Sequence, residues 1–278
     1  FYNCTKLSEM EIPAQVQEID DYSFYGCSAF AAIPLDADSQ LAAIGDYAFA
    51  YSGLTGFAAP SQLLYIGDHG FAGAPLETLT LNDGLLELGD YAFADCGLSK
   101  TQVLTLPGSL NYVGVYALRG ATELTEITVP FVGRTVTDDS GFLTLFDRAA
   151  ADNESMQNLH TVHVLRGEIL PDCAFQYCNY ISEVELPMEM KQIGLGAFWN
   201  TGTREEELKV HFPDSLVTIG EGAFSQAPIK TAELPESLIS IGRRAFYETK
   251  LTEIFIPQNV SEIGSGAFAL CDNLTKFE

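Results

Sequence analysis

Apolar and polar residues alternate in a short pattern that recurs along the chain. The first copy reads LSEMEIP at residues 7–13, and further copies occupy residues 124–130, 181–187 and 251–257. A two-residue period predicts a half-buried β-strand. Because proline has no backbone N–H to donate, its place at the end of each copy predicts the end of strand pairing. Each copy is therefore expected to form one short strand.

A second phrase, IGDYAF at residues 44–49, follows the strand pattern after a further apolar approach. Related copies lie at 66–71, 88–93, 193–198, 219–224, 241–246 and 263–268, with looser ones at 19–24, 113–118 and 170–175. Most of the terminal aromatic residues are 22 to 26 residues apart. A fixed period in this range is typical of stacked supersecondary units that share one continuous core.

The residues of the second phrase predict how the chain returns across each coil. The approach to the isoleucine is expected to be extended, and the glycine after it permits a tight turn or a close backbone approach. The acidic residue that follows is an N-cap candidate for about one helical turn. The alanine before the aromatic residue leaves room for the ring, so the aromatic side chains are expected to stack into a buried spine.

Five of the six cysteines share one column, three residues after the repeat aromatic. Other copies carry a small residue there, as at Ser52. Exchange with such residues is the behaviour of a small buried side chain, so most thiols are expected to be free. Cys4 with Cys27, and Cys173 with Cys178, are the only pairs for which a disulfide stays open. The cysteine spacings match no zinc motif.

Composition narrows the classes of partner. The 278 residues include 14 Lys plus Arg against 38 Asp plus Glu, for a net charge of -24. This charge repels phosphate groups, so nucleic acid is not expected as a partner, and anionic membrane surfaces are disfavoured. The sequence has neither an apolar run long enough to span a membrane nor a signal-peptide pattern. Both ends fall within a repeat, which suggests a piece of a longer protein.

The combination of Leu-x-x-Ile-x-Ile-Pro, Ile-Gly and Ala-Phe, often followed by cysteine, resembles the BspA-like leucine-rich repeat family over nearly the whole chain. The resemblance implies an α/β, right-handed leucine-rich repeat solenoid that is rich in β-structure and has short helical turns. One short parallel β-strand per coil of 22 to 26 residues and about twelve coils are expected. Residues 1–278 would form a single domain, with loop-lengthened, irregular repeats at 131–158.

The family is associated with surface proteins of oral and gut bacteria and of some parasitic protists. The resemblance therefore implies an extracellular or cell-surface protein that binds proteins or glycans, host extracellular matrix components among them. It implies no enzymatic activity, no cofactor and no direct membrane insertion. It supplies no site motif, because the recurring residues of the family are structural.

The outward positions of the strands are where we expect a ligand site, because parallel stacking sets equivalent side chains about 4.8 Å apart. In leucine-rich repeats these positions line the concave face. The outward positions in the first half of the chain carry mainly small side chains. The second half gathers charges and an exposed aromatic ring, which is a common anchor of protein interfaces. The candidate ligand-binding residues are Glu183, Glu185, Lys209, His211, Glu233, Glu253 and Phe255.

Metal binding receives weaker support from the sequence. His163 and His211 stand among glutamates in successive coils, a set that a divalent metal or a solvated charge ladder explains, and the ladder is favoured. An acidic loop also lacks the alternating spacing of a calcium chelator and is interpreted as a soluble surface loop. Its acidic residues are Asp138, Asp139, Asp147, Asp152 and Glu154. No metal site is predicted.

Catalytic motifs are absent from the sequence, which has no nucleophile elbow, no metalloprotease helix motif and no phosphate-binding loop. No catalytic or cofactor-binding residue is predicted. The sequence favours a surface-displayed binding module. The alternative is a structural spacer or scaffold that displays other domains of a longer surface protein.

Overall fold

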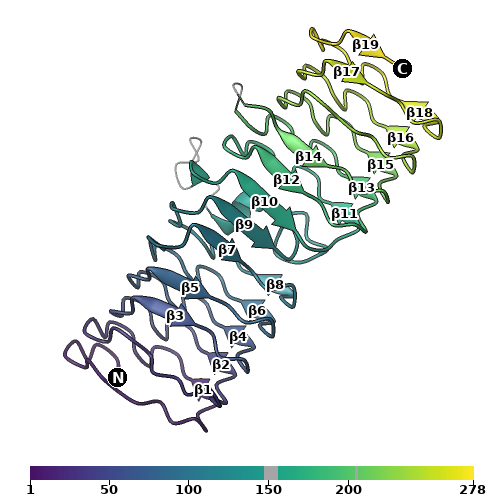
Figure 1. The fold of residues 1–278 in the computed structure, drawn as a ribbon. Helices are drawn as coiled ribbons and strands as arrows, with labels where there is room; N and C mark the ends of the chain where they lie inside the picture. The colour runs from purple at the N-terminus through teal and green to yellow at the C-terminus, as the bar shows by residue number, and fades with distance from the viewer. Residues whose placement is uncertain (147–155, 204–205) are drawn as a thin grey trace. The chain divides into compact units, whose positions relative to one another are not determined.

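The computed structural model describes residues 1–146, 156–203 and 206–278 (Figure 1). The chain divides into two compact units. Unit 1 comprises Phe1–Pro130 and Thr144–Asn158, and unit 2 comprises Phe131–Leu143 and Leu159–Glu278. The boundary between the units falls in the segment that the sequence marks as irregular. Both units consist of stacked parallel coils, about eleven turns in all among the described residues. The single-domain expectation stays a prediction.

The alternating segments form the first set of parallel strands, called here the front strands. In β5 the central Leu79 is buried while Thr78 and Thr80 are exposed, which is the predicted alternation. Within unit 1, β3 pairs with β5 and β7 with β9; within unit 2, β10, β12 and β14 pair in order and β17 pairs with β19. The front strands are β3 (Gly56–Ala58), β5 (Thr78–Thr80), β7 (Val103–Thr105), β9 (Glu126–Val129), β10 (Thr161–Val164), β12 (Glu183–Glu185), β14 (Lys209–His211), β17 (Glu253–Ile254) and β19 (Lys276–Phe277).

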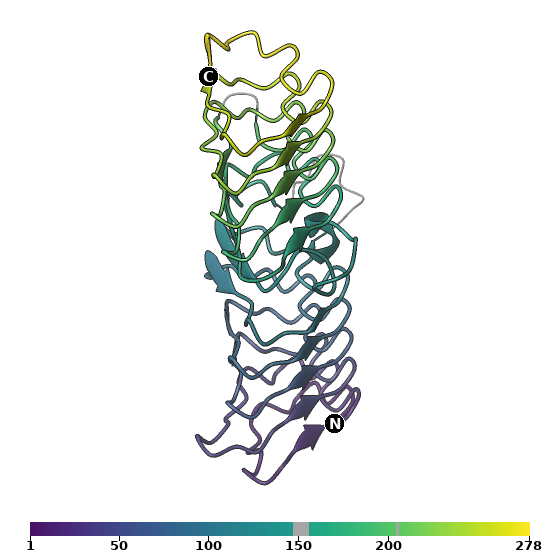
Figure 2. The same cartoon turned by 90° about the vertical axis from the view of Figure 1, so that its right-hand side faces the viewer.

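The return segments form a second set of parallel strands, the back strands, on the opposite side of the coils (Figures 1 and 2). Ile44 pairs with Ile66 and Ile66 with Leu88, so the apolar residues of the repeated phrase stack in register. The expectation of one strand per coil is therefore wrong, because the extended return also pairs with its neighbours. The back strands are β1 (Glu18–Ile19), β2 (Ala43–Ile44), β4 (Tyr65–Ile66), β6 (Glu87–Leu88), β8 (Tyr112–Val113), β11 (Ile169–Leu170), β13 (Gln192–Ile193), β15 (Thr218–Ile219), β16 (Ser240–Ile241) and β18 (Glu262–Ile263).

The predicted helical turns are not present, and the α/β label is not supported. Tyr47 has a φ of 54° and Tyr51 a φ of 56°, which is left-handed backbone that an α-helix cannot contain. The N–H groups of Ala48 and Ala50 donate to carbonyls three residues earlier, as in turns, whereas those of Tyr47 and Phe49 donate to the next coil. Along this segment, successive N–H groups therefore donate alternately to a carbonyl of the neighbouring coil and to one of their own turn. The helix whose bounds the structure describes is the short 3-10 helix η1 (Phe142–Leu145).

Stacked phenylalanine rings fill the centre of each unit. In unit 1, Phe49 and Phe71 lie 5.3 Å apart between ring centroids and are nearly parallel. In unit 2, Phe198 and Phe224 are 4.9 Å apart. All four rings are fully buried. The predicted stacking of the repeat aromatics is confirmed within each unit.

Glycine after the isoleucine is required by the neighbouring coil. A Cβ atom on Gly45 would lie 2.4 Å from Oδ1 of Asp21, and one on Gly67 would lie 2.5 Å from Oδ1 of Asp46. The same Asp46 oxygen accepts a hydrogen bond from the N–H of Asp68 at 2.8 Å. The aspartate expected to cap its own helical turn instead bonds to the following coil.

The cysteines are all free thiols, as predicted for most of them. Their column also has a polar role: the Sγ atoms of Cys27, Cys96 and Cys271 each donate to the carbonyl of the repeat phenylalanine one coil earlier, at 3.0 Å. Thr201 donates in the same way to Phe175 at 2.6 Å. A small side chain with a thiol or hydroxyl donor therefore suits the position three residues after the repeat aromatic.

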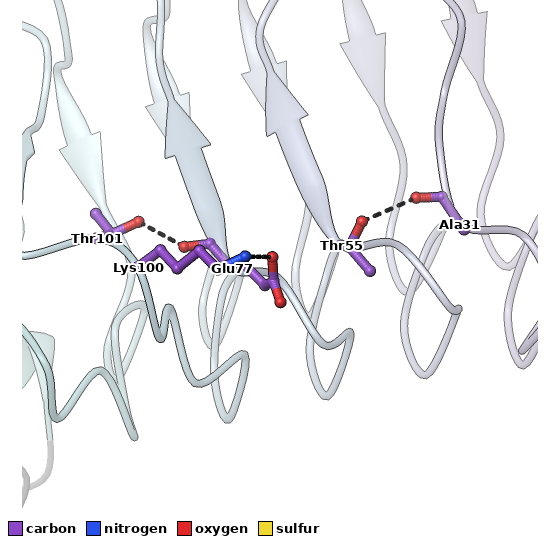
Figure 3. A network of polar contacts seen from close by, with 5 residues as sticks. All are labelled: Ala31, Thr55, Glu77, Lys100 and Thr101. Carbon is purple, nitrogen blue, oxygen red and sulfur yellow. Dashed lines mark hydrogen bonds and ion pairs between the residues drawn. The ribbon is translucent and has the colours of Figure 1, made fainter.

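Hydroxyl groups near the entrance to the front strands add further links between coils. Thr55 Oγ1 donates to the carbonyl of Ala31, and Thr101 Oγ1 donates to that of Glu77 (Figure 3). The Lys100 ammonium also lies 2.5 Å from the Glu77 carboxylate. Each coil of unit 1 is thus linked to its neighbour at its front edge, its core and its corner.

Candidate functional site

The outward positions of β10, β12 and β14 lie in the lateral register that the repeat pattern predicts. Glu185 is directly opposite His163 on one side and His211 on the other. Glu183 is likewise opposite Lys209. These side chains project from the front strands because the residue between them, such as Val184, is buried. The register places the predicted charges of the first three coils on one surface, called here the strand face of unit 2.

The remaining candidate residues continue this face with one interruption. Glu253 belongs to β17, and the exposed Phe255 is the first residue after this strand. Glu233 is exposed but lies in a segment without a strand, between β14 and β17. The coil there stays stacked through backbone hydrogen bonds, such as the one from Thr252 N–H to the carbonyl of Lys230. Whether the seven residues act together as a ligand site stays a prediction.

Two histidine–glutamate contacts organise the strand face of unit 2. His163 Nδ1 lies 2.6 Å from Glu185 Oε2, and His211 Nε2 lies 3.1 Å from Glu183 Oε1. An ionised carboxylate only accepts, so the histidine nitrogen carries the proton in each contact. The sequence placed these residues in neighbouring coils, but it did not indicate that His211 reaches diagonally to Glu183 rather than straight across to Glu185.

A groove of about 580 Å³ lies beside these contacts. Residues of two successive coils line the groove, Lys209 and His211 from one and Thr231 and Glu233 from the next. The lining combines one cation, one imidazole and apolar side chains such as Phe212 with four carboxylates, those of Glu207, Asp214, Glu233 and Glu236. Such a mixture suits a polar, hydrogen-bonding ligand better than an apolar one.

Phe255 is the apolar element of the strand face, with 48% of its surface exposed. The Lys276 ammonium lies 4.3 Å from the centre of its ring, which is cation–π geometry. Lys276 is also directly opposite Glu253 in the pairing of β17 with β19. The sequence analysis did not select Lys276, although its offset from Glu253 gave the signal.

The acidic loop is only partly described. The Asp138 carboxylate accepts hydrogen bonds from the backbone N–H groups of Arg134 and Ser140 and from the Ser140 hydroxyl. Partial burial raises the pKa of Asp138, but these hydrogen bonds outweigh it and lower the pKa on balance. Asp138 therefore supports a local turn. Three further acidic positions of the loop, Asp147, Asp152 and Glu154, lie outside the described residues.

Unit 1 carries an aromatic column that the sequence analysis did not select. The rings of Tyr22, Tyr47, His69 and Tyr91 stack with centroids 4.4 to 4.9 Å apart. The sequence signal was the aromatic residue at the fourth position of the phrase, as at Tyr47, which histidine replaces at His69. Because each ring covers the face of the next, little ring face is left for a ligand, and we assign the column to stability.

The arrangement of repeats agrees with a comparison against protein-family models. The model of the BspA type leucine-rich repeat region matches residues 1–99, 42–142 and 206–278, with six copies. The chain belongs to this family. BspA-type repeats and their fold are typical of protein-interaction or scaffold proteins and are typically non-enzymatic.

Solved structures similar to this BspA-type chain include bacterial leucine-rich repeat proteins. One from Bacteroides ovatus is 26% identical, with a TM-score of 0.49, over 100% of this chain and 74% of that one. The pneumococcal vaccine antigen PcpA is 24% identical, with a TM-score of 0.45, over 97% and 67%. A leucine rich cell surface protein from Faecalibacterium prausnitzii is 19% identical, with a TM-score of 0.41, over 96% and 78%.

No curated protein matches the BspA-type chain. Among residues 1–146, 156–203 and 206–278, no helix has the length and apolar character needed to cross a membrane.

Proposed function

We propose that this chain is a non-enzymatic binding module displayed at a bacterial cell surface, where it recognises a host protein or glycan through the strand face of unit 2. The observation that carries the proposal is the exposed Phe255 ring, set beside the Lys276 ammonium and the Glu253 carboxylate. An exposed ring flanked by both charges offers apolar contact and hydrogen-bonding groups together, which is the composition of an interface anchor.

The contrast between the two units supports placing the ligand on unit 2. The front strands of unit 1 present mainly small or hydroxyl side chains, as in β3 (Gly56–Ala58) and β5 (Thr78–Thr80). Those of unit 2 present both carboxylates and cations within three strands, as at Glu185, Lys209 and His211. Polar groups at fixed spacing on a paired sheet recognise a ligand without the cost of ordering the backbone that carries them.

A scaffold role is the second candidate function. The stacked links between coils make each unit a stiff spacer whether or not its surface binds anything, and an exposed phenylalanine is common on protein surfaces. The two functions differ in what surface substitutions do. Such substitutions do not affect the role of a spacer, but they weaken ligand binding by a binding module.

The test is a screen of the purified chain against immobilised matrix proteins and glycans, followed by paired variants. Phe255→Ala with Glu185→Lys is expected to raise the Kd of the selected ligand about tenfold or more. The matched control is Val103→Ala with Glu11→Lys, which changes an exposed apolar residue and an exposed glutamate on the front face of unit 1. Equal loss in both variants would move the site off unit 2, and a screen without any ligand would favour the spacer.

A further inference from the structure

Three ligand-type side chains converge on the strand face of unit 2. Glu183, Glu185 and His211 each present one donor atom, and these atoms all lie within 4.8 Å of one another. We propose that these three residues form a binding site for a zinc ion. The proposal does not rest on the proposed function, because a metal ion can bind here whether or not the chain recognises a protein or glycan.

The spacing of the donor atoms fits the size of a zinc site. In a tetrahedral site with bonds of about 2.0–2.2 Å, neighbouring ligand atoms lie about 3.3 Å apart. His211 Nε2 and Glu183 Oε1 are already 3.1 Å apart. A zinc ion would take the place of the proton that Nε2 donates to Glu183. In a neutral imidazole this proton would move through solvent to Nδ1, so the ring stays neutral, and in an imidazolium, whose Nδ1 is already protonated, it would be released. Small rotations of exposed side chains then complete the geometry.

The sheet brings these atoms together and keeps them together. Glu183 and Glu185 are two residues apart on β12, so both project from the same face. His211 is on the adjacent β14, directly opposite Glu185, while its ring reaches Glu183. The imidazole therefore lies across both carboxylates. The buried Val184 between the glutamates anchors their backbone.

His163 is a positioning residue for this site. Its Nδ1–H donates to Glu185 Oε2 at 2.6 Å from the opposite side of the strand. This hydrogen bond orients the carboxylate and leaves its other oxygen for the metal. Hydrogen bonds of this kind to metal-binding carboxylates are common, and their removal typically lowers metal affinity about 10–100-fold.

The donor set selects zinc over the common alkaline-earth ions. One imidazole nitrogen and two carboxylate oxygens suit zinc, whereas calcium requires six to eight oxygen ligands. The charge of the ion balances the two glutamates. With three protein ligands, a tetrahedral ion keeps a fourth position for water or for a side chain of a bound partner. The cation Lys209, opposite Glu183 in the register, opposes metal binding by charge repulsion.

The direct test is calorimetric titration of the chelator-treated chain with zinc chloride. One zinc ion per chain is expected to bind, with weaker affinity at acidic pH because the imidazole must be neutral to ligate. His211→Ala is expected to weaken binding more than about tenfold, and His163→Ala about tenfold. Lys209→Ala is expected to strengthen it. His160→Ala is the matched control. His160 is exposed on the same coil as His163, but its ring contacts the backbone carbonyl of Tyr180 and neither of the two glutamates of the site.

Thiolates also ligate zinc, and the Cys4 thiol is exposed. Cys4→Ser is therefore expected to leave zinc binding unchanged. Cobalt(II) in the proposed site should show the visible absorption of tetrahedral nitrogen–oxygen coordination without the near-ultraviolet band of a thiolate ligand. Because the substituted side chains are on the surface, circular dichroism should show that all variants fold. Absence of zinc binding, or binding that survives His211→Ala, would overturn the proposal and leave two ordinary histidine–glutamate contacts.

Discussion

The carboxylate of Asp46 accepts a hydrogen bond from the backbone N–H of Asp68, 22 residues further along the chain. Asp68 repeats this contact with Asp90 at the same distance of 2.8 Å. Each aspartate thus fixes the position of the next coil through a single oxygen atom. The column ties together neighbouring coils at the corner where the chain turns.

Asp46→Ala is therefore expected to destabilise unit 1 by about 1 kcal/mol, because one charge-assisted hydrogen bond at a solvent-exposed corner is lost. Asp46→Asn keeps the Oδ1 acceptor and should cost less than half as much. Urea denaturation followed by circular dichroism measures both. Equal destabilisation by the two variants would show that the carboxylate acts by some means other than this bond.

The phenylalanine spines should dominate the stability of each unit. Phe71→Ala in unit 1 and Phe246→Ala in unit 2 are each expected to lower the free energy of unfolding by about 3–5 kcal/mol, because a fully buried ring leaves a cavity that stacked coils cannot close. Phe255→Ala removes an exposed ring and should cost far less. Chemical denaturation of the three variants tests this, and equal midpoints would contradict the assignment of the spines.

The buried thiols should respond to alkaline pH. Burial raises the pKa of Cys96 to about 12, above the value of about 8.5 for an unfolded chain. A raised folded-state pKa means that the stabilisation is fully present below about pH 8.5 and is lost as the pH rises towards 12. The melting temperature is expected to fall over this range, and to fall less in Cys96→Ser, which keeps a donor to the Phe71 carbonyl.

Alkylation provides the companion measurement. Iodoacetamide is expected to modify the exposed Cys4 first in the folded chain, whereas Cys96 and Cys178 should react only after unfolding. Desolvation by burial raises the pKa of the Cys178 thiol as well, so neither side chain supplies a thiolate near neutral pH. Rapid modification of Cys96 in the native chain would show that its coil opens readily.

The front strands were predictable because two independent periods agreed. The two-residue alternation assigned Leu79 inward and Thr80 outward, and the repeat length set Thr80 opposite Ala58. Both signals are carried by residue type and spacing alone. The lateral register of the candidate site followed from the same logic, as the pairing of Glu185 with His211 illustrates.

The corner of the coil was not predictable by the same means. An acidic residue after glycine is a local N-cap signal, but the acceptor oxygen of Asp46 serves the next coil, which a local pattern does not contain. The left-handed backbone of Tyr47 is also unusual for an aromatic residue, and its cost is offset by ring stacking on His69. The diagonal reach of His211 to Glu183 likewise depends on side-chain rotation, which spacing does not specify.

At three successive corners of unit 1, a glycine and an aspartate of the preceding coil form an interchangeable joint. Gly45 packs against Asp21, Gly67 against Asp46 and Gly89 against Asp68. The contact between one coil and its neighbour is therefore the same as the contact between the next two coils. A recombination event that adds or removes one period of the gene between two such joints leaves matching surfaces on both sides. The length of such an array can therefore change by whole coils during evolution while every remaining junction keeps its complement.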